Sequence, residues 1–178
     1  MSKGLPRSLA HANTSVLTIN SYAIDHTMSF TGASGSADDA TVVIGGLPEG
    51  NILFLGAVSY LTLTGPTSAD LADDFQGDYS IGTAPNTDDE LMFLTDSDII
   101  VGTPIAAATA EVSPKTRSTT NHDAVDLGLL SKIFDNTDGS IELNLNVLLD
   151  DGEITNLASV DITAKGVLHI AFAIMGDD

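Results

Sequence analysis

Few residues in this sequence have types and spacings that could support catalysis. The histidines are His11, His26, His122 and His169, and no two of them are spaced as a metal-binding pair. His26 lies on the larger face of an alternating segment, which favours a core or interface position, and His169 lies on a polar face. The sequence contains no cysteine, so zinc–thiolate sites, disulfides and thiol catalysis are excluded.

Motifs for nucleophilic catalysis and for phosphate binding are also missing. Residues 32–36 (GASGS) come near the G-x-S-x-G nucleophile motif, but they lack its second glycine and belong to a polar loop. The sequence has no Walker loop, no G-x-G-x-x-G and no H-E-x-x-H. We therefore predict that the protein is not an enzyme and that it has no catalytic site, cofactor or metal.

The carboxylates cluster in pairs and triplets, but these clusters do not indicate acid–base chemistry. Adjacent side chains in a loop diverge, so pairs such as Asp38-Asp39 and Asp150-Asp151 have no shared target. Residues 135–139 (DNTDG) partly match a calcium-binding loop, without its alternating acidic spacing and its closing glutamate. A solvated turn is the favoured interpretation of this segment, and a calcium site is the alternative.

Composition limits the partners of this chain. Its 178 residues suit one domain with or without an extended arm, and 43% hydrophobic residues exclude a disordered acidic tail. With 25 acidic and 6 basic residues, the net charge is −19. This charge repels phosphate backbones and anionic lipid headgroups, so we predict no nucleic-acid partner and no membrane partner. No apolar run follows the N-terminal basic residues, which predicts synthesis in a cytoplasm without secretion.

Short segments with a period of two predict the elements of an all-β fold. Residues 24–30 alternate large and polar side chains, and in residues 140–149 Asn144 and Asn146 alternate with apolar residues, which predicts a wet outer face. Residues 158–175 keep their phase through Gly166, which predicts a bend or bulge there and not a hairpin tip. Roughly eight such strands with polar loops predict an antiparallel β-sandwich or jelly roll.

Helix is expected in one or two short pieces only. Residues 67–74 (TSADLADD) predict a short helical turn, and residues 123–134 predict a short helix with one apolar face. Residues 1–14 show no period and predict an extended N-terminal arm. The jelly-roll domain is predicted to span residues 15–178.

Residues 52–64 form the longest apolar run and are apolar on both faces of the predicted strand. Ile52, Phe54, Val58 and Tyr60 alternate with the other apolar residues of the run. A strand of this kind is covered on both faces, and the second cover can come from this chain or from another subunit. The candidate contact residues are therefore those of the second face, Leu53, Leu55, Leu61 and Leu63, together with the basic arm residues Lys3 and Arg7.

Several stretches, in their order along the chain, resemble the small decoration, or cement-type, structural proteins of tailed-phage virions. The matching stretches are residues 24–30 (IDHTMSF), 47–52 (LPEGNI), 79–83 (YSIGT), 140–147 (SIELNLNV), 165–170 (KGVLHI) and 176–178 (GDD). The resemblance covers about residues 16–178 and leaves the arm outside. It implies a β-sandwich that trimerises on the capsid exterior, with the major capsid protein and further copies of itself as partners.

The leading interpretation is a phage virion structural protein that decorates and stabilises the capsid exterior as a homo-oligomer. The alternative is a carbohydrate-binding or adhesin-type module on a virion or cell surface. Sugar rings stack on exposed aromatic residues, so this alternative requires Tyr22, Tyr60 and Tyr79 on one surface, because tryptophan is absent. A cupin-type enzyme would need clustered histidines and carboxylates, which the histidine spacing does not support.

Overall fold

The computed structural model describes residues 17–32, 37–87, 95–105, 115–123, 133–155 and 157–175. These ranges contain nine β-strands and no helix. The strands are β1 (Leu17–Thr31), β2 (Asp38–Gly46), β3 (Gly50–Thr64), β4 (Gly77–Gly82), β5 (Ile100–Ile105), β6 (Thr116–Asp123), β7 (Ile133–Asn136), β8 (Glu142–Leu149) and β9 (Ser159–Ile174).

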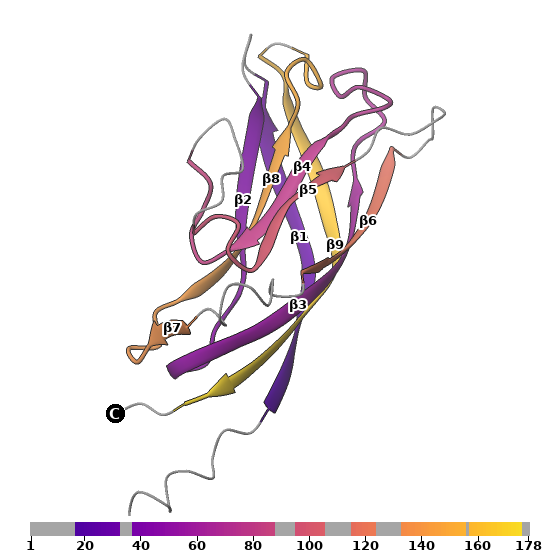
Figure 1. The fold of residues 1–178 in the computed structure, drawn as a ribbon. Helices are drawn as coiled ribbons and strands as arrows, with labels where there is room; N and C mark the ends of the chain where they lie inside the picture. Colours follow the sequence, from indigo (N-terminus) through magenta and orange to yellow (C-terminus); the bar gives the residue numbers. More distant parts are fainter. Residues whose placement is uncertain are drawn as a thin grey trace, which may run out of the picture.

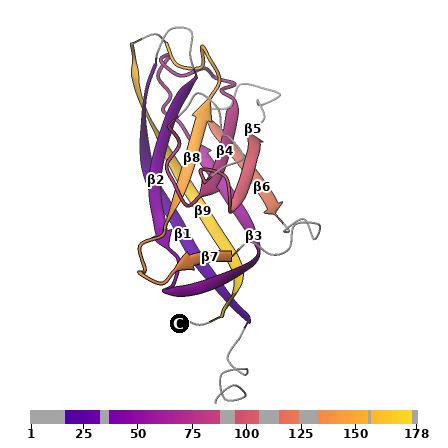
Figure 2. The ribbon, with the colours of Figure 1, turned by 60° about the vertical axis from the view of Figure 1, so that its left-hand side comes forward.

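The strands form two antiparallel sheets that face each other (Figure 1, Figure 2). Sheet A has the order β1-β9-β3-β6, with the short β7 also paired to β3, and sheet B has the order β2-β8-β4-β5. When β7 is set aside, β1 pairs with the last strand, β2 with the one before it, β3 with β6, and β4 with β5. A long hairpin rolled up in this way is a jelly roll, so the predicted fold class is confirmed.

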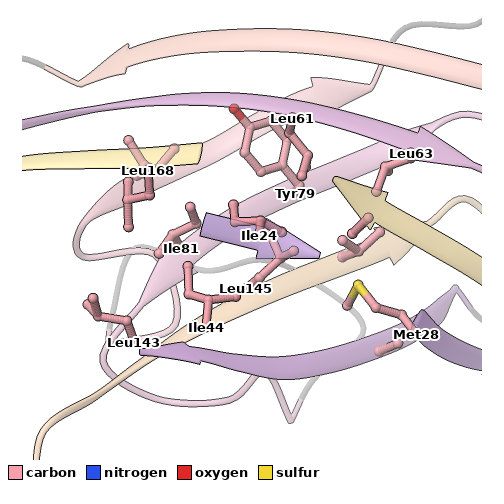
Figure 3. Close-up of a cluster of buried hydrophobic side chains, with 14 of the residues drawn as sticks. Ile24, Met28, Ile44, Leu61, Leu63, Tyr79, Ile81, Leu143, Leu145 and Leu168 are labelled. Carbon is pink, nitrogen blue, oxygen red and sulfur yellow. The ribbon is translucent and has the colours of Figure 1, made fainter. Parts of the chain in front are cut away.

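The core lies between the two sheets and is built from alternate residues of the strands. Figure 3 shows side chains of both sheets meeting there, among them Ile24 and Leu168 of sheet A and Leu145 of sheet B. Tyr79 of β4 is fully buried, and its hydroxyl lies 2.8 Å from the hydroxyl of Ser59 in β3. This hydrogen bond joins the sheets and satisfies the polar end of a core aromatic residue.

Strand β9 is continuous through Gly166, as the period of two predicts. Gly166 pairs with Ile24 on one side and with Leu61 on the other, without a register shift. Gly166 is thus not a hairpin tip, as predicted, and of the two predicted alternatives, a bend or a bulge, the bulge is wrong. A Cβ atom at position 166 would lie 1.9 Å from the carbonyl oxygen of Tyr60, so glycine is needed for the close approach of β3.

The bulge of sheet A lies instead in β3. The register with β9 shifts between Phe54 and Gly56, so Leu55 is the inserted residue. One inserted residue exchanges the two faces of a strand, and the core-facing residues are therefore Phe54 before the bulge but Leu61 and Leu63 after it. The prediction that Leu61 and Leu63 share a face with Leu55 is wrong for this reason.

The outer face of β8 is covered, so the predicted wet face is also wrong. Asn144 and Asn146 point away from the core but are 3% and 0% exposed. The described parts of segment 83–99 lie over them, because the side-chain amide of Asn146 donates to the carbonyls of Ala84 and Asp96. Both side chains are thus buried outside the sandwich core, and Asn146 is held there by hydrogen bonds.

The predicted helical turn at residues 67–74 is wrong as well. The segment consists of turns and one isolated bridge between Leu71 and Ile154, because Leu71 is drawn into the core. Of the helix predicted for residues 123–134, Asp123 belongs to β6 and the last two residues to β7, and residues 124–132 lie outside the described part. The arm at residues 1–14 also lies outside it, so the domain boundary stays a prediction.

Candidate functional site

The described residues offer no cluster of metal-binding side chains. No group of three or more histidines and carboxylates among them could hold a metal ion. Nδ1 of His169 lies 2.7 Å from the hydroxyl of Ser21, and its ring meets the Tyr60 ring edge-on at 6.4 Å. His26 is half-buried on the core-facing side of β1. Within the described ranges, no helix is long and apolar enough to cross a membrane.

The segment that partly matches a calcium loop is a turn that satisfies its own carboxylates. Oδ1 of Asp135 accepts hydrogen bonds from the backbone and hydroxyl of Thr137, and Oδ1 of Asp138 accepts the same pair from Ser140. The hydrogen bonds from Ser140 lower the pKa of Asp138 below its ordinary value. Asn136 is buried and ties this turn to the β2–β3 connection through two backbone carbonyls. The geometry matches the favoured interpretation, a solvated turn.

An apolar surface lies on the outer face of sheet A, at the end of the sheet where β1 begins and β9 ends; Figure 1 shows this end of the two strands at the bottom of the view. Side chains that alternate away from the core in β1, β3, β7 and β9 form it. Its exposed large members are Leu17 (61%), Ile19 (66%), Leu55 (41%), Tyr60 (46%) and Ile133 (57%). We call this surface, together with Ala23, Leu53, Val58, Val167, Ala171 and Ala173 between them, the apolar face.

The strand register makes the apolar face contiguous. Successive rows across the sheet are Leu17–Ala173–Leu53–Ile133, then Ile19–Ala171 beside the Leu55 bulge, then Ser21–His169–Val58, then Ala23–Val167–Tyr60. Side chains in such rows are near neighbours, because paired residues of adjacent strands point to the same side. Ser21 and His169 are the polar members, and they contact each other.

Charged residues mark the borders of the apolar face and are missing inside it. Asp25 and Lys165 form an exposed ion pair at 3.5 Å on one border, and Asp135 lies at the opposite border beside β3. Beyond the ion pair, the outward residues are polar, with hydroxyls as at Thr27 and Thr163 and a carboxylate at Asp161. No Asp, Glu, Lys or Arg occupies the described outward positions between these borders, although the chain carries a net charge of −19.

The candidate contact residues predicted from the sequence fall in three places. Leu53 and Leu55 lie on the apolar face, while Leu61 and Leu63 are 2% and 0% exposed in the core, so they are not contact residues. Lys3 and Arg7 lie outside the described residues. Sequence reasoning missed Leu17, Ile19 and Ile133. For Leu17 and Ile19, the available signal was their alternation with Thr18 and Asn20, which continues the phase of β1.

The tyrosines do not form a platform for stacking sugar rings. Tyr79 is in the core, and the Tyr22 hydroxyl donates to the carbonyl of Gly46 from the core-facing side of β1. Only Tyr60 of the three is exposed on the outer face. The phenylalanines in the described part of the chain are buried, namely Phe30, Phe54, Phe75, Phe134 and Phe172. The surface that the carbohydrate-binding alternative requires is therefore missing from the described residues.

No family model matches this chain, and no curated protein matches it in sequence. Among solved structures, it is similar to the VP2 subviral particle of infectious bursal disease virus, with 12% identity and a TM-score of 0.45. The match covers 87% of this chain and 32% of that one. A T=1 particle derived from the same virus matches with 11% identity and a TM-score of 0.38, over 87% of this chain and 31% of the other. This chain thus spans about a third of the length of the proteins it matches.

Proposed function

We propose that this chain is a virion structural protein that coats the outside of a tailed-phage capsid as a homo-oligomer. The observation that carries the proposal is the apolar face. The largest apolar patch on a protein, typically about 300–600 Å², is often functional, and this one carries no charge on a chain with a net charge of −19, which favours a site of association. The described residues add no metal cluster or aromatic platform that would favour an enzyme or a sugar-binding module.

An exterior position follows from the charge of the chain. A net charge of −19 is repelled by packaged DNA, whose phosphates bind proteins through Lys and Arg. The same charge favours basic patches on the outer surface of a shell built by the major capsid protein. We propose that the basic arm residues Lys3 and Arg7 also contact the shell or a neighbouring subunit. The resemblance to decoration proteins adds a trimer as the proposed oligomer.

Stabilisation of the capsid would follow from mass action. A protein that binds the assembled shell and not its free subunits shifts the equilibrium toward the assembled state. Each oligomer that contacts the shell at several points also gains by avidity, so modest individual contacts are sufficient.

The test is quantitative mass spectrometry of gradient-purified particles from a culture that produces this protein. We expect the chain at a fixed ratio to the major capsid protein, accessible to protease or antibody on intact particles. Particles made without it should release their DNA at a lower temperature, and added purified protein should restore the wild-type value. Absence of the chain from particles, or equal release temperatures at full occupancy, would contradict the proposal.

A further inference from the structure

We propose that the apolar face is the surface on which a second copy of this chain docks. This inference rests on the proposed function for its biological setting, because decoration of a shell is proposed to involve oligomers. It goes further by assigning the contact to one half of the outer face of sheet A.

Charge selects the partner. Two copies that each carry a net charge of −19 repel one another over most of their surface. The apolar face is a region where they can meet without opposing carboxylates, between the Asp25–Lys165 ion pair and Asp135. A basic shell would instead be met by the acidic remainder of the molecule. The uncharged face therefore fits another copy of the same chain better than it fits a basic partner.

The apolar face is large enough to form the centre of such a contact. Strands β1, β9, β3 and β7 lie about 4.8 Å apart and span about 14 Å, while Leu17 to Ala23 extends about 20 Å along β1. The resulting sheet area of about 300 Å² is at the lower end of the largest apolar patches on monomers. It would form the apolar centre of a contact that buries about 800 Å² on each partner.

The edge strand of sheet A, β1, lies at the same place. Among the described strands β1 pairs with β9 alone, so its other side is a sheet edge, which β2 of sheet B meets where Tyr22 donates to the carbonyl of Gly46. Natural edge strands are usually protected by lysine, proline or a bulge. Between Leu17 and Ile24, β1 has no lysine, no proline and no register shift, and its outward Leu17 and Ile19 are the most exposed residues of the face. A subunit that covers β1 would prevent this edge from pairing with unrelated strands.

The polar half of the same sheet face marks where the contact ends. There, Ser29 donates to Asp161 at 2.6 Å and the hydroxyls of Thr62 and Ser118 lie 3.0 Å apart, so these groups satisfy one another in water. Inside the apolar face, His169 is already paired with Ser21 at 2.7 Å. A partner can thus cover this pair without leaving both of its polar groups unsatisfied.

The test is sedimentation velocity of the purified full chain at micromolar concentration. The variant I19E/L55E places two carboxylates on the apolar face, and L17E/I133E is a second, independent variant. The matched control T27E/T64E places the same charges on the same sheet face, in its polar half. We expect an oligomer for the wild type and the control. For both apolar-face variants we expect folded monomers, with dissociation constants raised by about 100-fold or more, because buried carboxylates lack partners.

Several outcomes would overturn the inference. A monomeric wild type at high micromolar concentration would show that residues 1–16, residues 124–132 or another protein cover the face. Oligomers of unchanged mass from both apolar-face variants would place the subunit contact elsewhere, as would dissociation by T27E/T64E alone. Particle binding is measured separately on the same samples. An oligomer that fails to bind any particle would contradict the proposed function and leave the docking surface intact.

Discussion

Asn146 should hold residues 83–87 and 95–99 over sheet B, and the substitution N146A tests this role. Oδ1 of Asn146 accepts hydrogen bonds from the Thr41 hydroxyl at 2.7 Å and from the backbone N–H of Asn86 at 2.9 Å. Its amide donates to the carbonyls of Ala84 at 3.2 Å and Asp96 at 2.7 Å. All four bonds are lost in the alanine variant, while the strand itself is unchanged.

The expected loss in the free energy of unfolding depends on which of these groups can form another hydrogen bond. The Asp96 carbonyl keeps the hydroxyl of Ser80 at 2.8 Å, and Thr41 is only partly buried and can turn to water. The buried Asn86 N–H loses this partner at about 1–3 kcal/mol, and the part-buried Ala84 carbonyl loses it at the lower end of that range. We therefore expect the free energy of unfolding to fall by about 3 kcal/mol in N146A. For a domain of this size, that change lowers Tm by about 6–12 °C.

The assay is thermal unfolding by circular dichroism, combined with amide hydrogen exchange. All variants are compared at one protein concentration, because oligomerisation makes Tm depend on concentration. The matched control is N144A, two residues earlier on the same covered face but outside this hydrogen-bonded network. Faster exchange should be confined to residues 83–87 and 95–99 in N146A. Equal losses of Tm in N146A and N144A, or unchanged exchange in this segment, would refute the reasoning.

Three further substitutions have defined outcomes. K115M removes the buried ammonium that donates to two backbone carbonyls of the 67–74 turn, and should lower the free energy of unfolding by about 2–4 kcal/mol in urea titrations; a loss within error would contradict this. G166A drives a Cβ into a β3 carbonyl and should give insoluble protein, so a soluble variant with wild-type Tm would be unexpected. Burial, and secondly the charge of Asp150, raise the pKa of Asp78 above 3.8, so the folded state loses stability as pH rises above 3.8. D78N should therefore raise Tm at pH 7 and much less below pH 3.8, and a gain independent of pH would count against the cause given.

The fold class was predictable from the sequence because the long strands carry their own period. The alternation in residues 24–30 and 140–149 and the unbroken phase through Gly166 reflect the two sides of a sheet that faces a core. The bulge at Leu55 was not predictable in this way. Residues 52–58 are apolar on both faces, so inserting one residue leaves the pattern unchanged while it exchanges the faces. The register is set by pairing with β9, which lies more than a hundred residues away along the chain.

The predicted wet face of β8 was wrong because the local sequence does not show which distant segment covers a polar face. Asn144 and Asn146 have the composition of a solvated face, and their burial depends on a distant segment whose backbone groups bind Asn146. For the candidate site, the double-sided apolar run led to Leu53 and Leu55, but the full surface needed the register. Ile133 is far from Leu17 in sequence and reaches it only through the row that joins β7, β3, β9 and β1.

The two contacts invoked for this protein should respond to salt in opposite directions. Copies that dock through the apolar face bring together bodies that are each strongly negative, so added salt screens their repulsion and tightens the oligomer. An acidic oligomer on a basic shell is held partly by attraction, so the same salt weakens its occupancy. Salt-dependent mass and salt-dependent occupancy therefore separate the two contacts without any substitution. If salt dissociated the oligomer itself, the copies would meet through complementary charges, which the described apolar face does not provide, and the assignment of that face would be wrong.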